Sequence, residues 1–173
     1  MRGLTEISNL VRSRRTHKSF GPEPVPPEVV DELLELARWA PNHHLTNPWR
    51  FHVLGPDTLD KLKQVAGPEA ASKLDRAPTL IVVTTTRMAD PVQDEEDLLA
   101  TGVAAYIVLL AAHARGLVGY WRTPAILRTA AGRAAVDIPD DERFVALLHL
   151  GHPRQDKDAP EREPAGHYVT YLP

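Results

Sequence analysis

The segment TLIVVTTT, residues 79–86, is the clearest β-strand in the sequence. Its middle is continuously apolar and β-branched, which is typical of a strand buried on both faces of its sheet. Three other segments also have strand character: RFHVLG at 50–55, LVGYW at 117–121 and RFVALLHLG at 143–151. The sequence therefore predicts a buried sheet at the centre of the molecule.

Helical spacing of apolar residues fills the intervals between these strands. We expect a short helix over 4–13, a helix from Pro27 that Pro41 ends, and a long helix from about Asp94 to Arg115. The alternation of helices and strands predicts one α/β or α+β domain over residues 1–173. Residues 155–173 are proline-rich and charged, which predicts an extended C-terminal arm.

The composition limits the function. The 173 residues are 43% hydrophobic, which is enough for one sizeable core. A net charge of −3 argues against a chain that binds nucleic acid over its whole length, and the lack of cysteine excludes disulfides, thiolate catalysis and iron–sulfur clusters. The first residues, MRGLTEISNL, lack the apolar core of a signal peptide, and no apolar run approaches the roughly 20 residues that span a bilayer. We therefore expect a cytoplasmic protein without a membrane or nucleic-acid partner.

The run RRTHKS, residues 14–19, is the first candidate site. It places three cations and two hydroxyls directly after a predicted helix. Guanidinium groups bind phosphate oxygens with two parallel hydrogen bonds, and hydroxyls add further donors. The run is therefore suited to an anion, although an exposed basic turn has the same composition.

The loop APNHHLTNPWRF, residues 40–51, raises the question of a metal site. We expect the adjacent His43 and His44 to point apart, and no further ligands follow at a metal-binding spacing. His149 and His152 lie three residues apart on a predicted strand, which places them on opposite faces. The sequence therefore predicts no metal site.

A third segment, GLVGYWRTPA at 116–125, places Arg122 at the end of a predicted strand. This arginine could face an electron-rich ring edge, or it could be an ordinary surface cation. The sequence contains no GxGxxG, GxxxxGK[ST] or GxSxG motif. Rossmann dinucleotide binding and P-loop chemistry are therefore disfavoured.

The order and spacing of these segments resemble the flavin-dependent nitroreductase family. RRTHKSF, residues 14–20, is similar to the family's Arg-Arg-Ser-x-Arg-x-Phe, and WAPNHHLTNPWRF, residues 39–51, to its Ala-Pro…Pro-Trp-x-Phe. GLVGYWRTP at 116–124 and LGHP at 150–153 correspond to its Gly-Leu-Gly-x-x-Trp and Leu-Gly-x-Pro segments. The Ala-Pro-x-His form of the loop resembles the compact branch of the family.

This resemblance implies an α+β fold with a central mixed β-sheet flanked by helices, assembled as a homodimer with FMN at the subunit interface. It implies an NAD(P)H oxidoreductase that reduces nitroaromatics, quinones or similar flat acceptors by ping-pong hydride transfer through the flavin. The same fold could serve dehalogenation, enone reduction or flavin fragmentation, or it could be a non-catalytic flavin-storage dimer. No side chain is expected to act as a catalytic acid or base.

The resemblance also assigns residues to the cofactor. The positions that match the phosphate and ribityl contacts are Arg14, Arg15 and Thr16. A late basic residue, Arg154 or Lys157, is expected to complete the phosphate site.

The remaining matches concern the flavin ring. The segment that lies along the isoalloxazine in that family corresponds to Trp121, Arg122 and Thr123. Trp39 and His43 match positions by which the partner subunit reaches the flavin, and Asn47 matches a position that contacts the ring or the ribityl chain.

Overall fold

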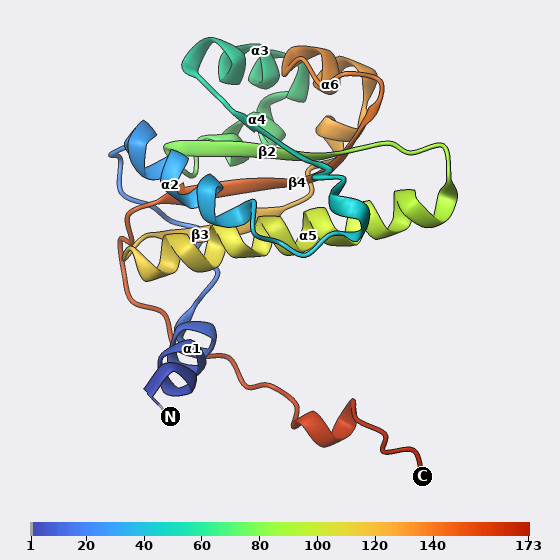
Figure 1. Ribbon diagram of the computed structural model, residues 1–173. Helices are drawn as coiled ribbons and strands as arrows, with labels where there is room; N and C mark the ends of the chain where they lie inside the picture. Colours follow the sequence, from blue (N-terminus) through green and yellow to red (C-terminus); the bar gives the residue numbers. More distant parts are fainter. Residues whose placement is uncertain (1) are drawn as a thin grey trace.

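The computed structural model describes residues 2–173, and its core is one sheet of four strands in the order β1-β2-β4-β3 (Figure 1). The strands are β1 Trp49–Val53, β2 Thr79–Thr86, β3 Val118–Arg122 and β4 Glu142–Gly151. The α+β fold is confirmed, but the prediction of a mixed sheet is wrong because all three pairings are antiparallel. The reason is that β4 lies between β2 and β3, which run in the same direction, and pairs with both.

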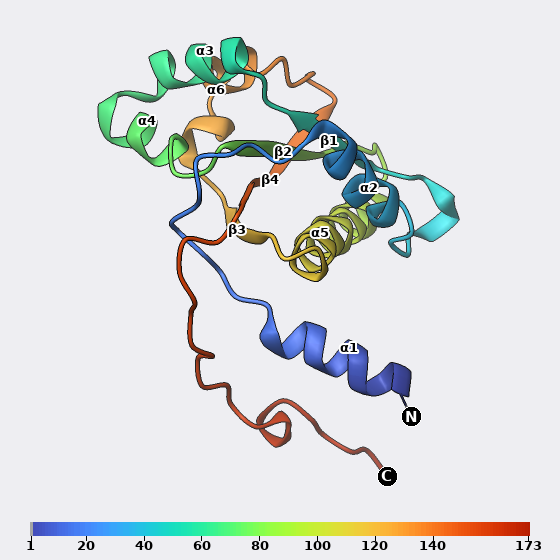
Figure 2. The same cartoon turned by 90° about the vertical axis from the view of Figure 1, so that its left-hand side faces the viewer.

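The helices form two layers on the sheet. Figure 2 shows α2 and α5 on one face and α3, α4 and α6 on the other. The α-helices are α1 Arg2–Ser13, α2 Pro27–Ala37, α3 Pro56–Ala66, α4 Pro68–Leu74, α5 Pro91–Ala114 and α6 Ala130–Ala135. The described residues also form three 3₁₀ turns: η1 His43–Leu45, η2 Ala125–Arg128 and η3 Ala165–His167.

Strand β2 runs through the middle of both layers, as its apolar sequence predicts. Its Ile81 and Val83 belong to the core under α2 and α5, while Leu80 and Val82 belong to the core under α3 and α6. All four side chains are almost completely buried. Because successive side chains of a strand point to opposite faces, an uninterrupted apolar run is what two separate cores require.

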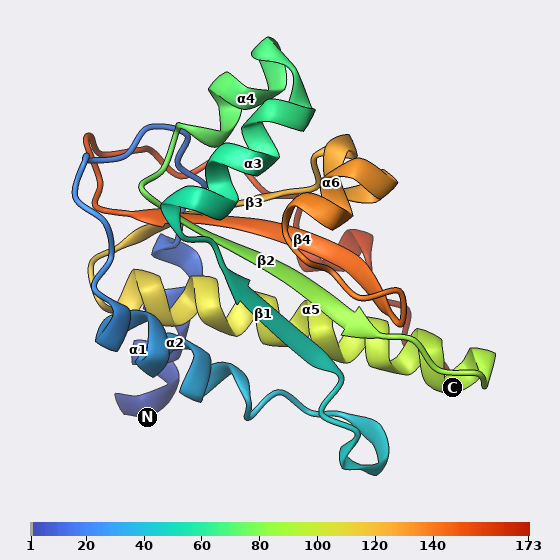
Figure 3. The ribbon, with the colours of Figure 1, turned by 90° about the horizontal axis from the view of Figure 1, so that it is seen from above.

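Helix α5 supports the sheet along its whole length (Figure 3). Its N-cap Asp90 accepts hydrogen bonds from the backbone amides of Val92 and Gln93, and the chain leaves the helix through Gly116 at φ +75°. At Gly119 of β3 a Cβ atom would lie only 2.5 Å from Leu109 Cδ2, so the absence of a side chain lets the helix approach the strand closely.

Contrary to the expectation from the sequence, α5 is long and apolar enough to cross a membrane by length and composition alone. Half of its apolar stretch is buried inside this fold. Its closest contacts are to the sheet and to α2, which makes it the core helix of the molecule.

The two termini lie on the same side of the body. Helix α1 stands away from the sheet below α5, and the chain after Pro153 runs beside it as an exposed arm (Figures 1 and 2). Over residues 155–173 the arm is extended except for the single turn η3. The first candidate site lies where α1, α5 and this arm meet.

Candidate functional site

The run 14–19 is not an exposed turn. It follows α1 and lies along the open edge of β3, where Thr16 forms a parallel bridge with Gly119 and the His17 amide donates to the Gly119 carbonyl at 3.2 Å. At the start of the run, Ser13 Oγ lies 2.7 Å from Nε2 of His113 in the last turn of α5. These contacts leave Arg14, Arg15 and Thr16 half-buried and His17 buried.

A cavity of about 840 Å³, which we call the arm cavity, opens between α1, α5 and the C-terminal arm. Five of its lining residues are basic and one is acidic. The full set is Val11, Arg12, Arg14, Arg15, Thr16, Tyr106, Lys157, Asp158, Ala159, Pro160 and Arg162.

The cations of the arm cavity are held by backbone carbonyls rather than by carboxylates. Arg14 Nη1 donates to the Arg15 carbonyl at 3.1 Å, and Arg15 Nη1 donates to the Arg14 carbonyl at 2.9 Å. Lys157 Nζ donates to the Thr16 carbonyl at 2.7 Å. Within residues 2–173 none of these three side chains forms an ion pair. The guanidinium and ammonium charges are therefore available to an anion.

Two histidines beside the cavity have pKa values that the nearby cations help to lower. Burial lowers the pKa of His113, and the charges of Arg14 and Arg15 lower it further. Burial also lowers the pKa of His17, with Lys157 as the next contribution. A site that combines uncompensated cations with a hydroxyl from Thr16 fits a phosphate group such as the one that FMN carries.

The path of the arm brings Lys157, and not Arg154, to the arm cavity. Lys157 lines the arm cavity, whereas Arg154 lines a different cavity. Arg162 and Tyr106 also line the arm cavity and were not predicted. No local sequence signal points to them, because only the path of the arm past α5 brings them to the N-terminal run.

The segment 121–123 does not present one face, although the prediction treats it as a unit. Trp121 packs into the core beneath α5, and Thr123 lies exposed beyond the end of β3. Tyr120 and Arg122 share the opposite face, because the side chains of a strand alternate. Tyr120, whose ring lies beside Arg122 on this face, was not singled out from the sequence.

Arg122 is held in place on this face of β3. Its Nη1 donates to the Lys73 carbonyl at the end of α4 at 3.0 Å, and burial lowers its pKa. The Arg122 guanidinium and the Lys18 ammonium each lie 5.9 Å from the centre of the Tyr120 ring. Two cations thus flank one aromatic ring.

His149 lies behind this ring, fully buried in β4. Its ring centre is 5.8 Å from that of Tyr120 and 6.4 Å from that of Phe20. Neither ring nitrogen finds a hydrogen-bond partner among the described residues. Burial, and then the charges of Arg122 and Arg76, lower its pKa to about 3, so the imidazole is neutral at physiological pH.

The loop Asn42–Asn47 has a strained backbone. His44, Leu45 and Asn47 have φ of +54°, +52° and +47°, in the left-handed region that residues other than glycine rarely adopt. Each such residue costs on the order of 1–2 kcal/mol, so neighbouring contacts have to impose the conformation. Strain of this kind collects at binding loops more often than elsewhere.

Hydrogen bonds to α5 and within the loop hold this conformation. Thr46 Oγ1 donates to the buried Asp97 carboxylate at 2.7 Å, and the Asn47 amide donates to Asn42 Oδ1 at 2.9 Å. His43 Nδ1 lies 2.7 Å from Glu96 Oε2.

The two histidines of this loop do not point apart as predicted. Their rings stack with centres 3.8 Å apart, because the left-handed backbone at His44 turns its ring back onto His43. Both side chains are exposed.

The loop and the N-terminal run lie at opposite ends of α5. The loop contacts α5 at Glu96 and Asp97, while Ser13 contacts it at His113. Sixteen residues at 1.5 Å each separate Asp97 from His113, a distance of about 24 Å along the helix. One chain therefore does not bring His43 or Asn47 of the loop to Arg14. Trp39, just after α2, is 75% exposed.

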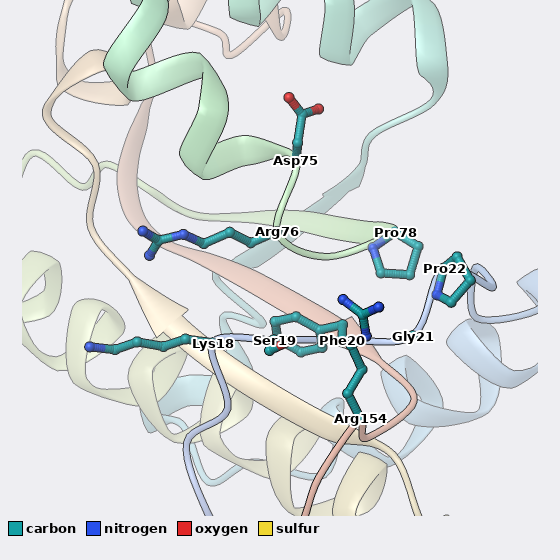
Figure 4. A pocket seen from close by; sticks show the side chains of 9 residues that line it. All are labelled: Lys18, Ser19, Phe20, Gly21, Pro22, Asp75, Arg76, Pro78 and Arg154. Carbon is teal, nitrogen blue, oxygen red and sulfur yellow. The ribbon is translucent and has the colours of Figure 1, made fainter.

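A second cavity of about 470 Å³, the Arg76 cavity, lies on the α4 side of the same β3 edge (Figure 4). It shares no lining residue with the arm cavity. Its lining consists of Lys18, Ser19, Phe20, Gly21, Pro22, Asp75, Arg76, Pro78 and Arg154.

Comparison with known proteins extends these observations. The model of the Nitroreductase family matches residues 11–73 and 66–152, which include the run 14–19, the loop and both inner strands of the sheet. A solved structure from Desulfovibrio desulfuricans, described as a "putative nitroreductase in complex with FMN", superposes with a TM-score of 0.81 at 29% identity and covers 96% of each chain.

Two curated relatives differ in their named activity. "Putative NAD(P)H nitroreductase YfhC" of Bacillus subtilis (strain 168) is 28% identical over an alignment of 174 positions, gaps included, which covers 91% of this chain and 90% of the relative. Iodotyrosine deiodinase 1 of Rattus norvegicus is 26% identical over an alignment of 190 positions, gaps included, which covers 90% of this chain and 65% of the rat protein.

Proposed function

The chain belongs to the nitroreductase family, and from this membership we propose that it is an FMN-dependent NAD(P)H oxidoreductase that reduces nitroaromatics, quinones or similar flat acceptors. The observation that carries the proposal is the arm cavity, whose cations have no carboxylate partner. The FMN complex of the related Desulfovibrio protein supports the choice of cofactor, and the name of the Bacillus relative supports NAD(P)H as the reductant.

In this proposal the phosphate of FMN binds in the arm cavity. Arg14, Arg15 and Lys157 neutralise its nearly two negative charges, and Arg162 approaches from the arm. Thr16 donates from its hydroxyl. Because the three inner cations are half-buried or fixed by backbone carbonyls, little side-chain entropy remains to be lost when the phosphate binds.

In the same proposal, the isoalloxazine ring of FMN extends along β3 toward Tyr120, Arg122 and Thr123. The chemistry that FMN supplies when bound is ping-pong transfer of a hydride from NAD(P)H and of reducing equivalents to the acceptor. Arg122, partly desolvated and fixed by the Lys73 carbonyl, stabilises negative charge at the ring edge. Lys18 adds a second cation above Tyr120. No side chain needs to act as an acid or base, because the acceptor takes protons from water.

The proposal includes a homodimer. Val92, Leu99, Val103 and Tyr106 are exposed and lie along one outward stripe of α5. The stripe ends at the arm cavity, which Tyr106 lines. On α1, Leu4, Ile7 and Val11 are also exposed, and Val11 lines the same cavity as Tyr106. A second copy packed on this surface would bury it.

A second copy would also bring the loop over residues 42–47 to the N-terminal run, which lies at the opposite end of α5 within one chain. In the dimer, Trp39, His43 and Asn47 of one subunit reach the flavin that Arg14 of the other subunit holds. The exposure of Trp39 and the imposed conformation of the loop support this role. The cytoplasm, where NAD(P)H is regenerated, is the compartment that we expect for such an enzyme.

The purified protein tests this function directly. We expect a flavin absorption band, release of FMN on denaturation, and NAD(P)H oxidation that depends on an added nitroaromatic or quinone. Arg14→Ala should weaken FMN binding by about 1.5–3 kcal/mol, the value of a charged hydrogen bond, while the fold stays intact. Arg87→Ala, at an exposed arginine beyond the end of β2, is the matched control.

Two results would contradict the proposal. Colourless protein that does not bind added FMN would exclude the cofactor. Bound FMN without NAD(P)H oxidation against any acceptor would favour the flavin-storage alternative over the enzyme.

The similarity to iodotyrosine deiodinase 1 favours a second candidate, reductive dehalogenation on the same site. Release of iodide from iodotyrosine by the reduced holoprotein would support it. Turnover of nitroaromatics without iodide release would favour the first candidate.

A further inference from the structure

The Arg76 cavity is a cationic pocket whose lining residues, apart from Lys18, are not part of the proposed FMN site. Three of its lining residues are basic: Lys18, Arg76 and Arg154. Its one carboxylate, Asp75, forms an ion pair with Lys63. Figure 4 shows the Asp75 carboxylate turned away from the three cations. The cavity therefore carries a net positive charge that its own acid does not offset.

None of the three cations has an anionic partner elsewhere. Within residues 2–173, Lys18, Arg76 and Arg154 form no ion pair, and the one close contact of Lys18 is with the Tyr120 ring. Surface lysines and arginines commonly face solvent alone, but these three exposed cations line one concave site. An anion bound in it could accept charge-assisted hydrogen bonds from them.

The walls of the cavity are fixed and partly apolar. Phe20 is buried and bridges to Pro153, and the Gly21 amide donates to the His152 carbonyl at 2.9 Å. Pro22 and Pro78 complete the apolar part of the lining. Apolar walls and a cationic mouth suit a flat molecule that carries one acidic group.

The cavity adjoins the proposed ring site but is separate from the phosphate site. Lys18 lines the cavity, and its ammonium group also lies 5.9 Å from the centre of the Tyr120 ring. The Arg122 guanidinium lies at the same distance from that ring. In Figure 4 the side chains of Lys18 and Arg76 extend in the same direction from two different segments, while Arg154 lies over Phe20 and Gly21. The charge of Arg76 is close enough to Arg122 to contribute to its lowered pKa.

We propose that the Arg76 cavity binds the carboxylate or phosphate of a flat electron acceptor and thereby selects acidic acceptors over neutral ones. This inference rests on the proposed function, since it places the reducible part of the acceptor beside the ring site at Tyr120. Arg76 and Arg154 are specificity-determining residues in this view. Lys18 serves both the cavity and the ring.

Paired substrates test the proposal on the FMN-loaded protein. The measured quantity is the ratio of kcat/KM for 4-nitrobenzoate to kcat/KM for 4-nitrobenzamide, which has nearly the same shape and no charge. We expect this ratio to fall about tenfold in Arg76→Gln or Arg154→Gln, the effect of losing one charged hydrogen bond. Arg87→Gln removes the same charge at the far end of β2 and should leave the ratio unchanged.

The reductant could supply an anionic group of its own, the 2′-phosphate of NADPH. The ratio of kcat/KM for NADPH to that for NADH, measured with 4-nitrobenzamide, distinguishes this source. If Arg76→Gln lowers the NADPH/NADH ratio and leaves the acceptor ratio unchanged, the assignment to the acceptor is overturned. If only the acceptor ratio falls, the assignment stands.

A direct binding measurement separates this inference from the proposed function. Calorimetric titration of the FMN-loaded protein with benzoate, which is not reduced, should show binding that Arg76→Gln weakens about tenfold and Arg87→Gln does not. Benzoate binding without turnover of any acceptor would uphold the cavity while the proposed function fails. Equal turnover of both nitro compounds, with no benzoate binding, would overturn the cavity while the proposed function stands.

Discussion

His149 shows how one buried side chain can make the fold sensitive to pH. It is completely buried, and neither ring nitrogen has a partner among the described residues. Its pKa is about 3 in the folded chain and 6.5 for an ordinary histidine. Between pH 6.5 and about pH 3, His149 therefore binds a proton in the unfolded chain but not in the folded chain. The stability that depends on neutral His149 is complete above pH 6.5 and is lost as the pH falls toward 3.

His149→Leu should remove this pH dependence. Between pH 7 and pH 5 the free energy of unfolding should fall by about 2 kcal/mol less in the variant than in the parent, from the linkage between proton binding and folding. Urea unfolding at the two pH values measures the difference. His44→Leu, which removes an exposed histidine, is the control for the loss of one titratable group. Equal pH dependence in the parent and in His149→Leu would contradict the assignment.

The sequence predicted which residue types form the candidate site better than it predicted which side chains lie next to one another. The run of Arg14, Arg15 and Thr16 was recognised from its charge and hydroxyls, and these residues do line one cavity. The resemblance to the family grouped Trp121 with Arg122 as one segment along the flavin ring, although strand alternation packs Trp121 against the core. Tyr120 was missed for the same reason.

The strands and helices could be predicted from the local sequence pattern, but the pairing of the strands could not. The apolar run of β2 and the helices α1, α2 and α5 lie close to where the sequence places them. The direction of the sheet depends on β4 entering between β2 and β3, a contact between segments far apart in the chain. The arm likewise carries no local signal for its contact with Thr16.

The loop over residues 42–47 is fixed to α5 by the hydrogen bond between Thr46 and Asp97. Thr46→Val removes the hydroxyl that donates to Asp97 at 2.7 Å and leaves a buried carboxylate with one donor fewer. We expect a loss of about 1–3 kcal/mol in the free energy of unfolding, the cost of an unsatisfied buried polar group. Weaker FMN retention should accompany it, because the loop is proposed to contact the flavin of the partner subunit.

Thr101→Val is the matched control for this loop variant. Thr101 is also buried, lies on α5 one turn after Asp97, and its hydroxyl has no hydrogen-bond partner among the described residues. Exchange of this hydroxyl for a methyl group should leave stability nearly unchanged. Equal losses in Thr46→Val and Thr101→Val would show that the Thr46–Asp97 hydrogen bond does not hold the loop.

At the scale of the whole molecule, the charges are segregated. The chain has a net charge of −3, yet two cavities at the β3 edge collect eight basic residues against two acidic ones. The apolar stripe of α5 leads to one of these cavities. A positively charged edge beside an apolar surface is the arrangement expected of a negatively charged cofactor enclosed between two copies of the chain.

Val103→Glu tests this arrangement. Val103 is 40% exposed in the middle of the α5 stripe, and an unpaired carboxylate buried between two copies would cost several kcal/mol. We expect the variant to sediment as a monomer and to bind FMN at least about tenfold more weakly, because the contacts of Trp39, His43 and Asn47 across the interface are lost. Val65→Glu places the same charge at a 43%-exposed valine of α3, on the opposite face of the sheet, and should change neither property. A Val103→Glu dimer would remove the stripe from the interface, whereas a monomer with full FMN affinity would show that each chain holds its flavin alone.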